Sequence, residues 1–222
     1  QAARARIAQA ASAAGRAPQD VRLLAVSKTF AAAAVRQAHT AGQRAFGESY
    51  VQEALEKIAA LSDLALEWHF IGPIQSNKTR PIAEHFDWVH SVDRIKIAER
   101  LSQARPSARG PLQVCLQVNI SGEDSKSGVA PEDVAELARQ VQALPNIALR
   151  GLMAIPQPSA DPHRQRAQFH WLRQLFEQLK AQGYALDTLS MGMSDDLEAA
   201  VAEGATIVRV GSAIFGQRKK AG

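Results

Sequence analysis

The sequence predicts an α/β fold in which eight parallel strands close into a single (β/α)8 TIM barrel, with an extra N-terminal helix. First, strand-like apolar runs alternate eight times with helix-like amphipathic segments. Such alternation indicates a parallel sheet with right-handed crossovers. Second, 222 residues suit one such barrel, and a 46% apolar composition supplies its core. An open doubly wound sheet is the alternative, but no glycine-rich dinucleotide loop follows the first strand.

The opening segment is rich in Ala and Arg and has no acidic residue before Asp20. That composition faintly resembles a transit peptide. An exposed helix with a thin apolar stripe explains it better, because Ala and Arg are strong helix formers. We expect residues 1–20 to form an N-terminal helix and lead-in, and residues 1–222 to form one barrel domain.

Each repeating unit is a strand followed by a helix. The predicted strands are residues 22–28, 44–49, 67–73, 88–93, 112–120, 147–155, 188–192 and 207–211. The predicted helices are residues 31–42, 51–61, 82–86, 94–104, 131–144, 163–183, 195–204 and the short 213–218. Gly42 stops the first of these helices, and Glu132 and Asp133 suit the first turn after Pro131.

Composition argues against several classes of partner. The net charge is +4, and Lys and Arg are scattered without an interleaved aromatic stripe, so we expect no nucleic-acid partner. No apolar run approaches the roughly 20 residues of a membrane span, so we expect no membrane partner. The single cysteine, Cys115, is expected to be a buried hydrophobe and suits a reducing cytoplasm. The six histidines show no metal-ligand spacing.

The first strand ends in a lysine. Leu24, Val26 and Lys28 fall on one side of a period-two strand, and barrel active sites lie at the carboxyl ends of strands. Lys28 therefore lies at the catalytic mouth. Its position alone leaves two interpretations open: a lysine that extends into water, or a desolvated nucleophile toward carbonyl groups.

The last strand favours the second interpretation. Arg209 shares a side with Ile207 and Gly211, so it points into the mouth if Ile207 points into the core. Gly211 and Ser212 then open a short helix, in the loop region where this fold commonly binds phosphate.

The loop after the seventh strand contributes Ser194. An ordinary helix N-cap is the alternative role for this serine. Asp195 and Asp196 favour that alternative, because they would repel a phosphate. A lysine, an inward arginine and a phosphate cup together are typical of pyridoxal 5′-phosphate (PLP) sites.

The chain resembles the pyridoxal phosphate homeostasis proteins, the YggS-like group also called proline synthetase co-transcribed proteins. The resemblance extends from about Leu23 to Arg218. Seven motifs carry it: "AVSKT", "FGESYVQE", "WHFIGPIQSNK", "VNISGEDSKSG", "RGLMAI", "LSMGMSDDLEAA" and "VRVGSAIFG". It implies a PLP-binding barrel of the alanine-racemase N-terminal-domain type, PLP fold type III.

The resemblance also implies roles for individual residues. Lys28 would bind PLP as a Schiff base, and Arg209 would face the pyridine nitrogen. The remaining contacts would come from Ser194, Gly211 and Ser212 at the phosphate, and from Met191 and Ser49 near the cofactor. Ser212 stands where the family more often has Thr, and keeps the hydroxyl. Ser49 stands where it more often has Asn, with a shorter reach.

The expected function is cytoplasmic PLP homeostasis, meaning buffering or delivery of the cofactor without strong catalysis. The expected partners are PLP and apo-PLP enzymes, and the resemblance suggests a monomer. Two alternatives stay open: a fold-type III PLP enzyme such as an amino-acid racemase, and a Schiff-base barrel enzyme acting on a phosphorylated metabolite. The roles of Lys126, His69 and Tyr50 also stay open. Lys126 lies on the correct rim to receive a transferred aldehyde, and His69 is either a pocket residue or a satisfied core histidine.

Overall fold

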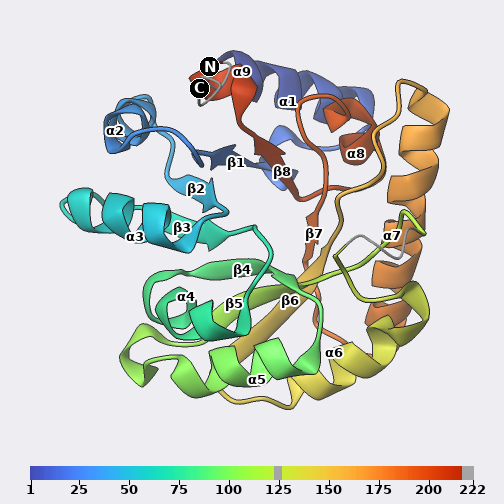
Figure 1. The fold of residues 1–222 in the computed structure, drawn as a ribbon. Helices are drawn as coiled ribbons and strands as arrows, with labels where there is room; N and C mark the ends of the chain where they lie inside the picture. Colours follow the sequence, from blue (N-terminus) through green and yellow to red (C-terminus); the bar gives the residue numbers. More distant parts are fainter. Residues whose placement is uncertain (123–126, 217–222) are drawn as a thin grey trace.

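The computed structural model describes residues 1–122 and 127–216, and within them the strands form a closed parallel barrel (Figure 1). The strands pair in chain order and β8 returns to β1. They are β1 (Arg22–Val26), β2 (Ala45–Glu48), β3 (Glu67–Phe70), β4 (Trp88–Val92), β5 (Leu112–Gln117), β6 (Ile147–Met153), β7 (Thr188–Ser190) and β8 (Ile207–Val210). The predicted (β/α)8 barrel is confirmed.

Helices follow the strands and cover the outside of the barrel (Figure 1). They are α1 (Ala2–Ala13), α2 (Ala32–Thr40), α3 (Val51–Ala60), α4 (Thr79–His85), α5 (Ile95–Ala104), α6 (Val134–Gln142), α7 (Pro162–Ala181), α8 (Leu197–Ala202) and α9 (Ser212–Phe215). Short 3-10 helices occur at Pro18–Asp20, Ser76–Lys78, Ser107–Arg109 and Pro131–Asp133. In the part of the chain described here, no helix combines the length and apolar character needed to cross a membrane.

Several strands end earlier than the apolar runs indicate. Residues 22–28 were expected to be extended, but β1 ends at Val26, where its pairing with Gly47 of β2 also ends. Thr29 then adopts a φ of 69°, which turns the chain out of the ladder. Lys28 therefore lies in a turn just beyond the strand.

The barrel interior contains a small apolar cluster of Leu24, Ala45 and Ile207, with Ile71 packed against it. Leu24 lies opposite Arg209 in the β1–β8 register, so the two side chains project to the same side of the sheet. Arg209 therefore points inward, as the sequence predicts. Cys115 is buried in the interior with Trp88 and Met153, and burial raises the pKa of its thiol to about 12.

The N-terminal helix packs against the outside of the barrel, where α1 contacts α8 (Figure 1). Its apolar stripe is thin but buried, and consists of Ala3, Ile7, Ala10 and Ala11. Arg6 on its exposed side forms an ion pair with Glu198 of α8 at 2.6 Å. The predicted helix within residues 1–20 is confirmed.

Candidate functional site

A cavity of about 510 Å³ opens at the carboxyl ends of the strands, where barrel chemistry is located. Its lining residues are Val26, Lys28, Ser49, Ile71, Ile155, Met193, Ser194, Asp195, Arg209, Gly211 and Ser212. Six of the seven residues that the sequence places at the cofactor therefore line one cavity. The seventh, Met191, does not.

Met191 is completely buried in the main hydrophobic core, and Met193 lines the cavity instead. Gly192 between them has a φ of 97°, so the alternation of the strand does not continue through the loop. Sequence reasoning missed Met193 for this reason. Ile71 and Ile155 were also missed, although each follows an inward residue at a spacing of two.

Ser194 is not a helix N-cap, because α8 begins at Leu197 and Asp196 occupies the capping position. The Asp196 carboxylate accepts a hydrogen bond from the backbone N–H of Met193 at 2.7 Å, and burial raises its pKa. The turn thus holds Ser194 at the rim of the cavity. Asp195 lines the same rim, so a negative charge does lie beside the predicted phosphate position.

A buried ion pair contacts Ser27, the residue before Lys28. Lys57 of α3 donates to Glu48 Oε1 at 2.8 Å and to the carbonyl oxygen of Ser27 at 2.7 Å. The Ser27 hydroxyl also donates to Glu48 Oε1, at 2.6 Å. Burial raises the pKa of Glu48, although both hydrogen bonds oppose the shift. Its other oxygen, Oε2, is buried with no hydrogen-bond partner among the described residues.

Glu53 connects this group to Thr29, the residue after Lys28. Its Oε1 accepts from Lys57 Nζ at 2.5 Å and from the backbone N–H of Thr29 at 2.6 Å. We call Ser27, Thr29, Glu48, Glu53 and Lys57 the Lys57 cluster. Because the cluster holds the residues on both sides of Lys28, it fixes the turn that presents the Lys28 amine to the cavity.

Replacement of Lys57 with methionine is expected to lower the free energy of unfolding by about 3 kcal/mol. The variant leaves the Glu48 carboxylate buried without its cation, and breaking a buried pair costs about that much. Urea unfolding measures the change. The exposed Lys96→Met is the matched control, and equal stability of the two variants would contradict the structural role of the cluster.

Arg209 is buried but faces the cavity, with an exposed fraction of 4%. Its guanidinium donates to Ser190 Oγ at 2.7 Å and to the carbonyl oxygen of Ala154 at 3.0 Å. Burial lowers its pKa to about 10, so it stays cationic at neutral pH. Within the described residues no carboxylate forms an ion pair with it, so this buried cation can donate to a ligand acceptor.

Comparison with known proteins identifies the family. Residues 1–219 match the family described as "Alanine racemase, N-terminal domain". The chain is 67% identical over 214 residues to the pyridoxal phosphate homeostasis protein of Pseudomonas aeruginosa, covering 96% of this chain and 92% of that protein. The chain belongs to the pyridoxal phosphate homeostasis protein family. The Escherichia coli (strain K12) member is 52% identical over 216 residues, with the same coverage.

Solved structures agree with this family assignment. PipY of Synechococcus elongatus, solved with PLP bound, superposes with a TM-score of 0.84 at 43% identity, covering 95% of this chain and all of that one. An alanine racemase of Clostridium difficile 630 superposes with a TM-score of 0.74 at 14% identity, covering 91% of this chain and 53% of that one. The racemase comparison shows a common fold.

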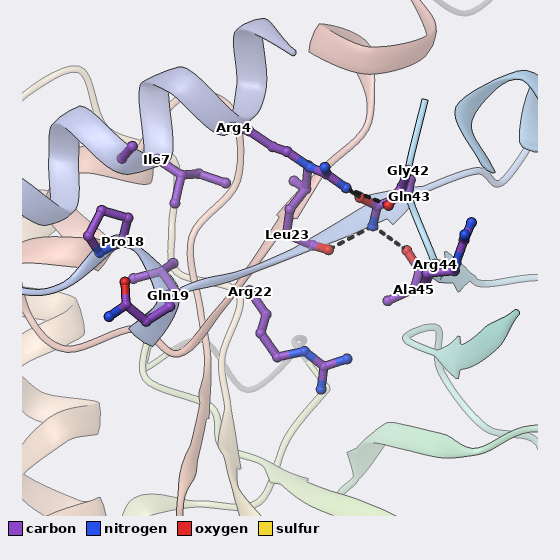
Figure 2. A pocket seen from close by; sticks show the side chains of 12 residues that line it. Arg4, Ile7, Pro18, Gln19, Arg22, Leu23, Gly42, Gln43, Arg44 and Ala45 are labelled. Atoms are coloured by element: carbon purple, nitrogen blue, oxygen red, sulfur yellow. Dashed lines mark hydrogen bonds between the residues drawn. The ribbon is translucent and has the colours of Figure 1, made fainter. Parts of the chain in front are cut away.

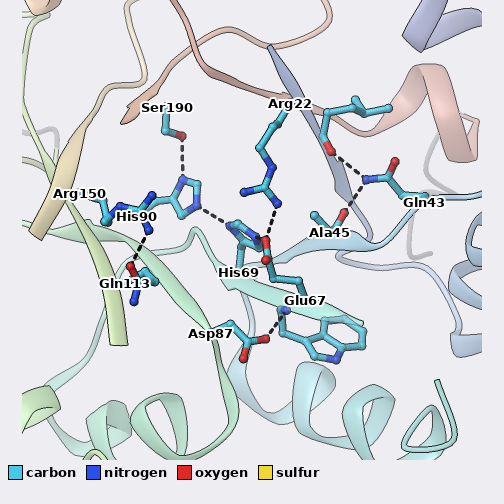
Figure 3. A network of polar contacts seen from close by, with 12 residues as sticks. Arg22, Gln43, Ala45, Glu67, His69, Asp87, His90, Gln113, Arg150 and Ser190 are labelled. Carbon is cyan, nitrogen blue, oxygen red and sulfur yellow. Dashed lines mark hydrogen bonds and ion pairs between the residues drawn. The ribbon is translucent and has the colours of Figure 1, made fainter. Parts of the chain in front are cut away.

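In this member of the homeostasis family, Arg209 donates to Ser190, and hydrogen-bonded polar side chains continue from Ser190 through the barrel interior (Figure 3). Ser190 Oγ lies 2.7 Å from His90 Nδ1, and His90 Nε2 lies 2.8 Å from His69 Nδ1. His69 Nε2 lies 2.6 Å from Glu67 Oε1. His69 is therefore a core histidine with both ring nitrogens bonded, which decides between its two predicted roles.

The buried histidines predict that this family member loses stability in acid. Burial lowers the pKa of His69, and lowers that of His90 well below its usual value. Below about pH 6.5 the unfolded chain therefore binds more protons at these sites than the folded chain. We expect the free energy of unfolding to fall from about pH 6.5 downward, by at most about 1.4 kcal/mol per pH unit for each histidine.

Urea unfolding between about pH 7 and pH 5 measures this dependence. The variant His90→Asn is expected to flatten the profile, whereas the exposed His163→Gln is the matched control and should not. A wild-type stability that stays constant over this range would contradict the assignment of two neutral buried histidines.

A second cavity, of about 500 Å³, lies at the amino ends of the strands (Figure 2). It is formed by α1, the start of β1 and the loop before β2, where Gln43 Nε2 donates to the carbonyl oxygens of Leu23 and Ala45. None of the predicted site residues lines it. Arg22 does, and it also forms an ion pair with Glu67 at 2.7 Å.

Lys126, which the sequence suggests as a second aldehyde acceptor, lies outside the described residues. Tyr50 lies on the carboxyl rim, as expected, and is 54% exposed. It caps α3 after β2 and is not among the lining residues of the Lys28 cavity.

Proposed function

We propose that this protein binds PLP in the Lys28 cavity and serves PLP homeostasis by buffering or delivering the cofactor, without strong catalysis. The observation that carries the proposal is that Lys28 and the buried Arg209 line one cavity. PLP offers an aldehyde to the first and a pyridine nitrogen to the second. The names of the relatives and the PLP-bound PipY structure support the same ligand.

The residues present fit each part of PLP. When bound, PLP supplies a reactive aldehyde and a ring that can delocalise negative charge. The Lys28 amine would hold PLP by condensing with this aldehyde, with release of one water molecule. Arg209 would face the pyridine nitrogen and, being cationic itself, would disfavour protonation of that nitrogen. A ring held in this way is a poor electron sink, which favours storage over turnover.

The phosphate end lies at the loops after β7 and β8. Ser194 and Ser212 offer hydroxyl groups there, and Gly211 leaves the backbone open to a ligand. A Cβ added at Gly211 would lie 3.3 Å from the carbonyl oxygen of Val26, so a larger residue would crowd this end of the cavity. Ser49 lines the wall of the cavity and contributes a short polar side chain.

Among the described residues that line the cavity, no tyrosine is present to serve as the second acid–base group of a racemase. Racemases of the barrel type that this chain resembles use a lysine on one face of the substrate and, on the other face, a tyrosine contributed across a subunit interface. The described residues that line this cavity include no tyrosine, since Tyr50 is turned to solvent and Tyr184 precedes β7 at the amino end of the barrel. We therefore infer a carrier of PLP, and we propose that it is cytoplasmic and monomeric and that its recipients are apo-PLP enzymes.

Incubation of the PLP-loaded protein with L-alanine tests the absence of turnover. Missing general acid–base help removes about 10²–10⁴-fold in rate, so we expect racemisation at least about 100-fold below that of an alanine racemase. The variant Tyr50→Phe is the control. Robust turnover that is lost in Tyr50→Phe would establish an enzyme instead.

Incubation with a PLP-free apo-enzyme tests delivery separately. We expect reactivation to exceed the rate that free PLP released from the carrier supports. Reactivation no faster than that rate would leave buffering and exclude direct delivery.

A further inference from the structure

Six side chains join the two ends of the barrel through its interior, and Figure 3 shows the part of this path from Ser190 to Arg22. We call them the interior chain: Arg209, Ser190, His90, His69, Glu67 and Arg22. They come from β8, β7, β4, β3 and β1. Arg209 lines the Lys28 cavity and Arg22 lines the cavity at the amino ends of the strands (Figure 2), so the interior chain connects the two.

We propose that Ser190, His90, His69 and Glu67 are positioning residues, which hold Arg209 for its ligand through hydrogen bonds that all run in one direction. This inference depends on the proposed function for one point, the identity of the Arg209 ligand as PLP. The direction of the hydrogen bonds and the positioning of the Arg209 guanidinium involve residues of this chain alone.

The acceptor end sets the direction. A carboxylate only accepts, so the 2.6 Å contact requires His69 Nε2 to carry a proton and donate to Glu67. A neutral His69 then accepts at Nδ1, so His90 donates from Nε2. By the same reasoning His90 accepts at Nδ1, and the Ser190 hydroxyl is its donor. Lowered pKa values keep both rings neutral at neutral pH.

The donor end agrees with this direction. Because the Ser190 proton points to His90, the oxygen lone pairs are left for Arg209, and a guanidinium can only donate. Hydrogen bonds in series polarise one another, so each link makes Ser190 Oγ a better acceptor. The chain does not reverse at neutral pH, since reversal would require Glu67 to be protonated and donate, and the hydrogen bond with His69 lowers the pKa of Glu67 to about 2. It therefore acts as a clamp on the guanidinium and does not conduct protons to it.

Nitrogen NMR of the histidines in protein without PLP tests the direction. We expect pyridine-type Nδ1 and pyrrole-type Nε2 signals for both His69 and His90 at neutral pH. A doubly protonated ring, or a proton on Nδ1 of either ring, would overturn the proposal. This measurement needs no variant, so it stands even if substitutions in the barrel interior prevent folding.

The clamp is tested at Arg209 in the same PLP-free protein. In Ser190→Ala we expect faster solvent exchange of the Arg209 guanidinium protons, and in Glu67→Gln a shift of their signals from the far end of the interior chain. The matched controls are Ser102→Ala, a buried serine on α5, and Glu136→Gln, whose carboxylate pairs with Arg139 on α6. Unchanged Arg209 signals in Ser190→Ala would overturn the positioning role.

PLP titration then relates the clamp to the ligand. Loss of one hydrogen bond to a charged group predicts about tenfold weaker PLP binding by Ser190→Ala, and no change for Ser102→Ala. Unchanged PLP affinity in Ser190→Ala would refute its effect on the ligand. If the wild-type protein itself does not bind PLP, the proposed function fails, whereas the NMR measurements still decide the direction and the clamp.

Discussion

Replacement of Lys28 with alanine is expected to abolish covalent attachment of PLP to the protein. Among the described residues, Lys28 is the lysine that lines the cavity at the carboxyl ends of the strands, and the Lys57 cluster fixes the turn in which it lies. Borohydride reduction of the loaded wild-type protein, followed by peptide mapping, should place the pyridoxyl group on Lys28. The variant should carry no such label.

Noncovalent binding should survive in Lys28→Ala, because Arg209 and the phosphate residues remain in place. The control Lys96→Ala removes an exposed lysine of α5 and should retain the full label. A pyridoxyl group found on Lys78 or Lys126 of the wild-type protein after borohydride reduction would show that the assignment of the attachment site to Lys28 is wrong.

The sequence was sufficient to predict the fold because its signals are local and repeat. Eight alternations of an apolar run and an amphipathic segment leave few arrangements, and right-handed parallel crossovers make the barrel the simplest of them. The period-two placement of Leu24 and Arg209 also survived in the structure, because both lie within paired strands. Strand ends were less predictable, since Thr29 leaves the ladder through a positive φ that its residue type does not indicate.

The Lys57 cluster could not be predicted from the sequence. In "VQEALEKIAAL", Glu53 and Lys57 are separated by four residues on a helix, which is the usual pattern of an exposed ion pair. Only the approach of α3 to the ends of β1 and β2 buries Lys57 and brings it to Glu48. Burial of a charge depends here on tertiary packing, which periodicity does not record.

The sequence gives only weak evidence for the interior chain, because the pattern of one strand does not show which residues of other strands it contacts. His69 and His90 are each the third residue of a predicted strand, in two consecutive strands, which permits a pair but does not require one. Their contact at 2.8 Å depends on the stagger between β3 and β4. The partner Ser190 comes from β7, a hundred residues later in the chain. Such a network becomes visible only when the barrel is closed.

Pyridoxal without its phosphate is expected to bind at least about 100-fold more weakly than PLP. Hydrogen bonds to charged groups contribute roughly 1.5–3 kcal/mol each, and about 1.4 kcal/mol is a tenfold change in affinity. Two such bonds, from Ser194 and from Ser212 or the backbone at Gly211, already account for this factor. Titrations of the PLP-free protein with PLP and with pyridoxal, followed by absorbance, measure it.

Substitutions at the rim of the cavity show whether the phosphate or the ring of PLP contributes more to its binding. Ser194→Ala and Ser212→Ala should weaken PLP binding and leave the weak binding of pyridoxal unchanged, because only PLP has a group for these hydroxyls. Asp195→Asn should strengthen PLP binding, since it removes a negative charge from the same rim. Under the proposed function Arg209 faces the ring, so Arg209→Met should weaken the binding of PLP and of pyridoxal by the same factor. Equal affinity of the wild-type protein for PLP and pyridoxal would exclude a phosphate site at the loops after β7 and β8.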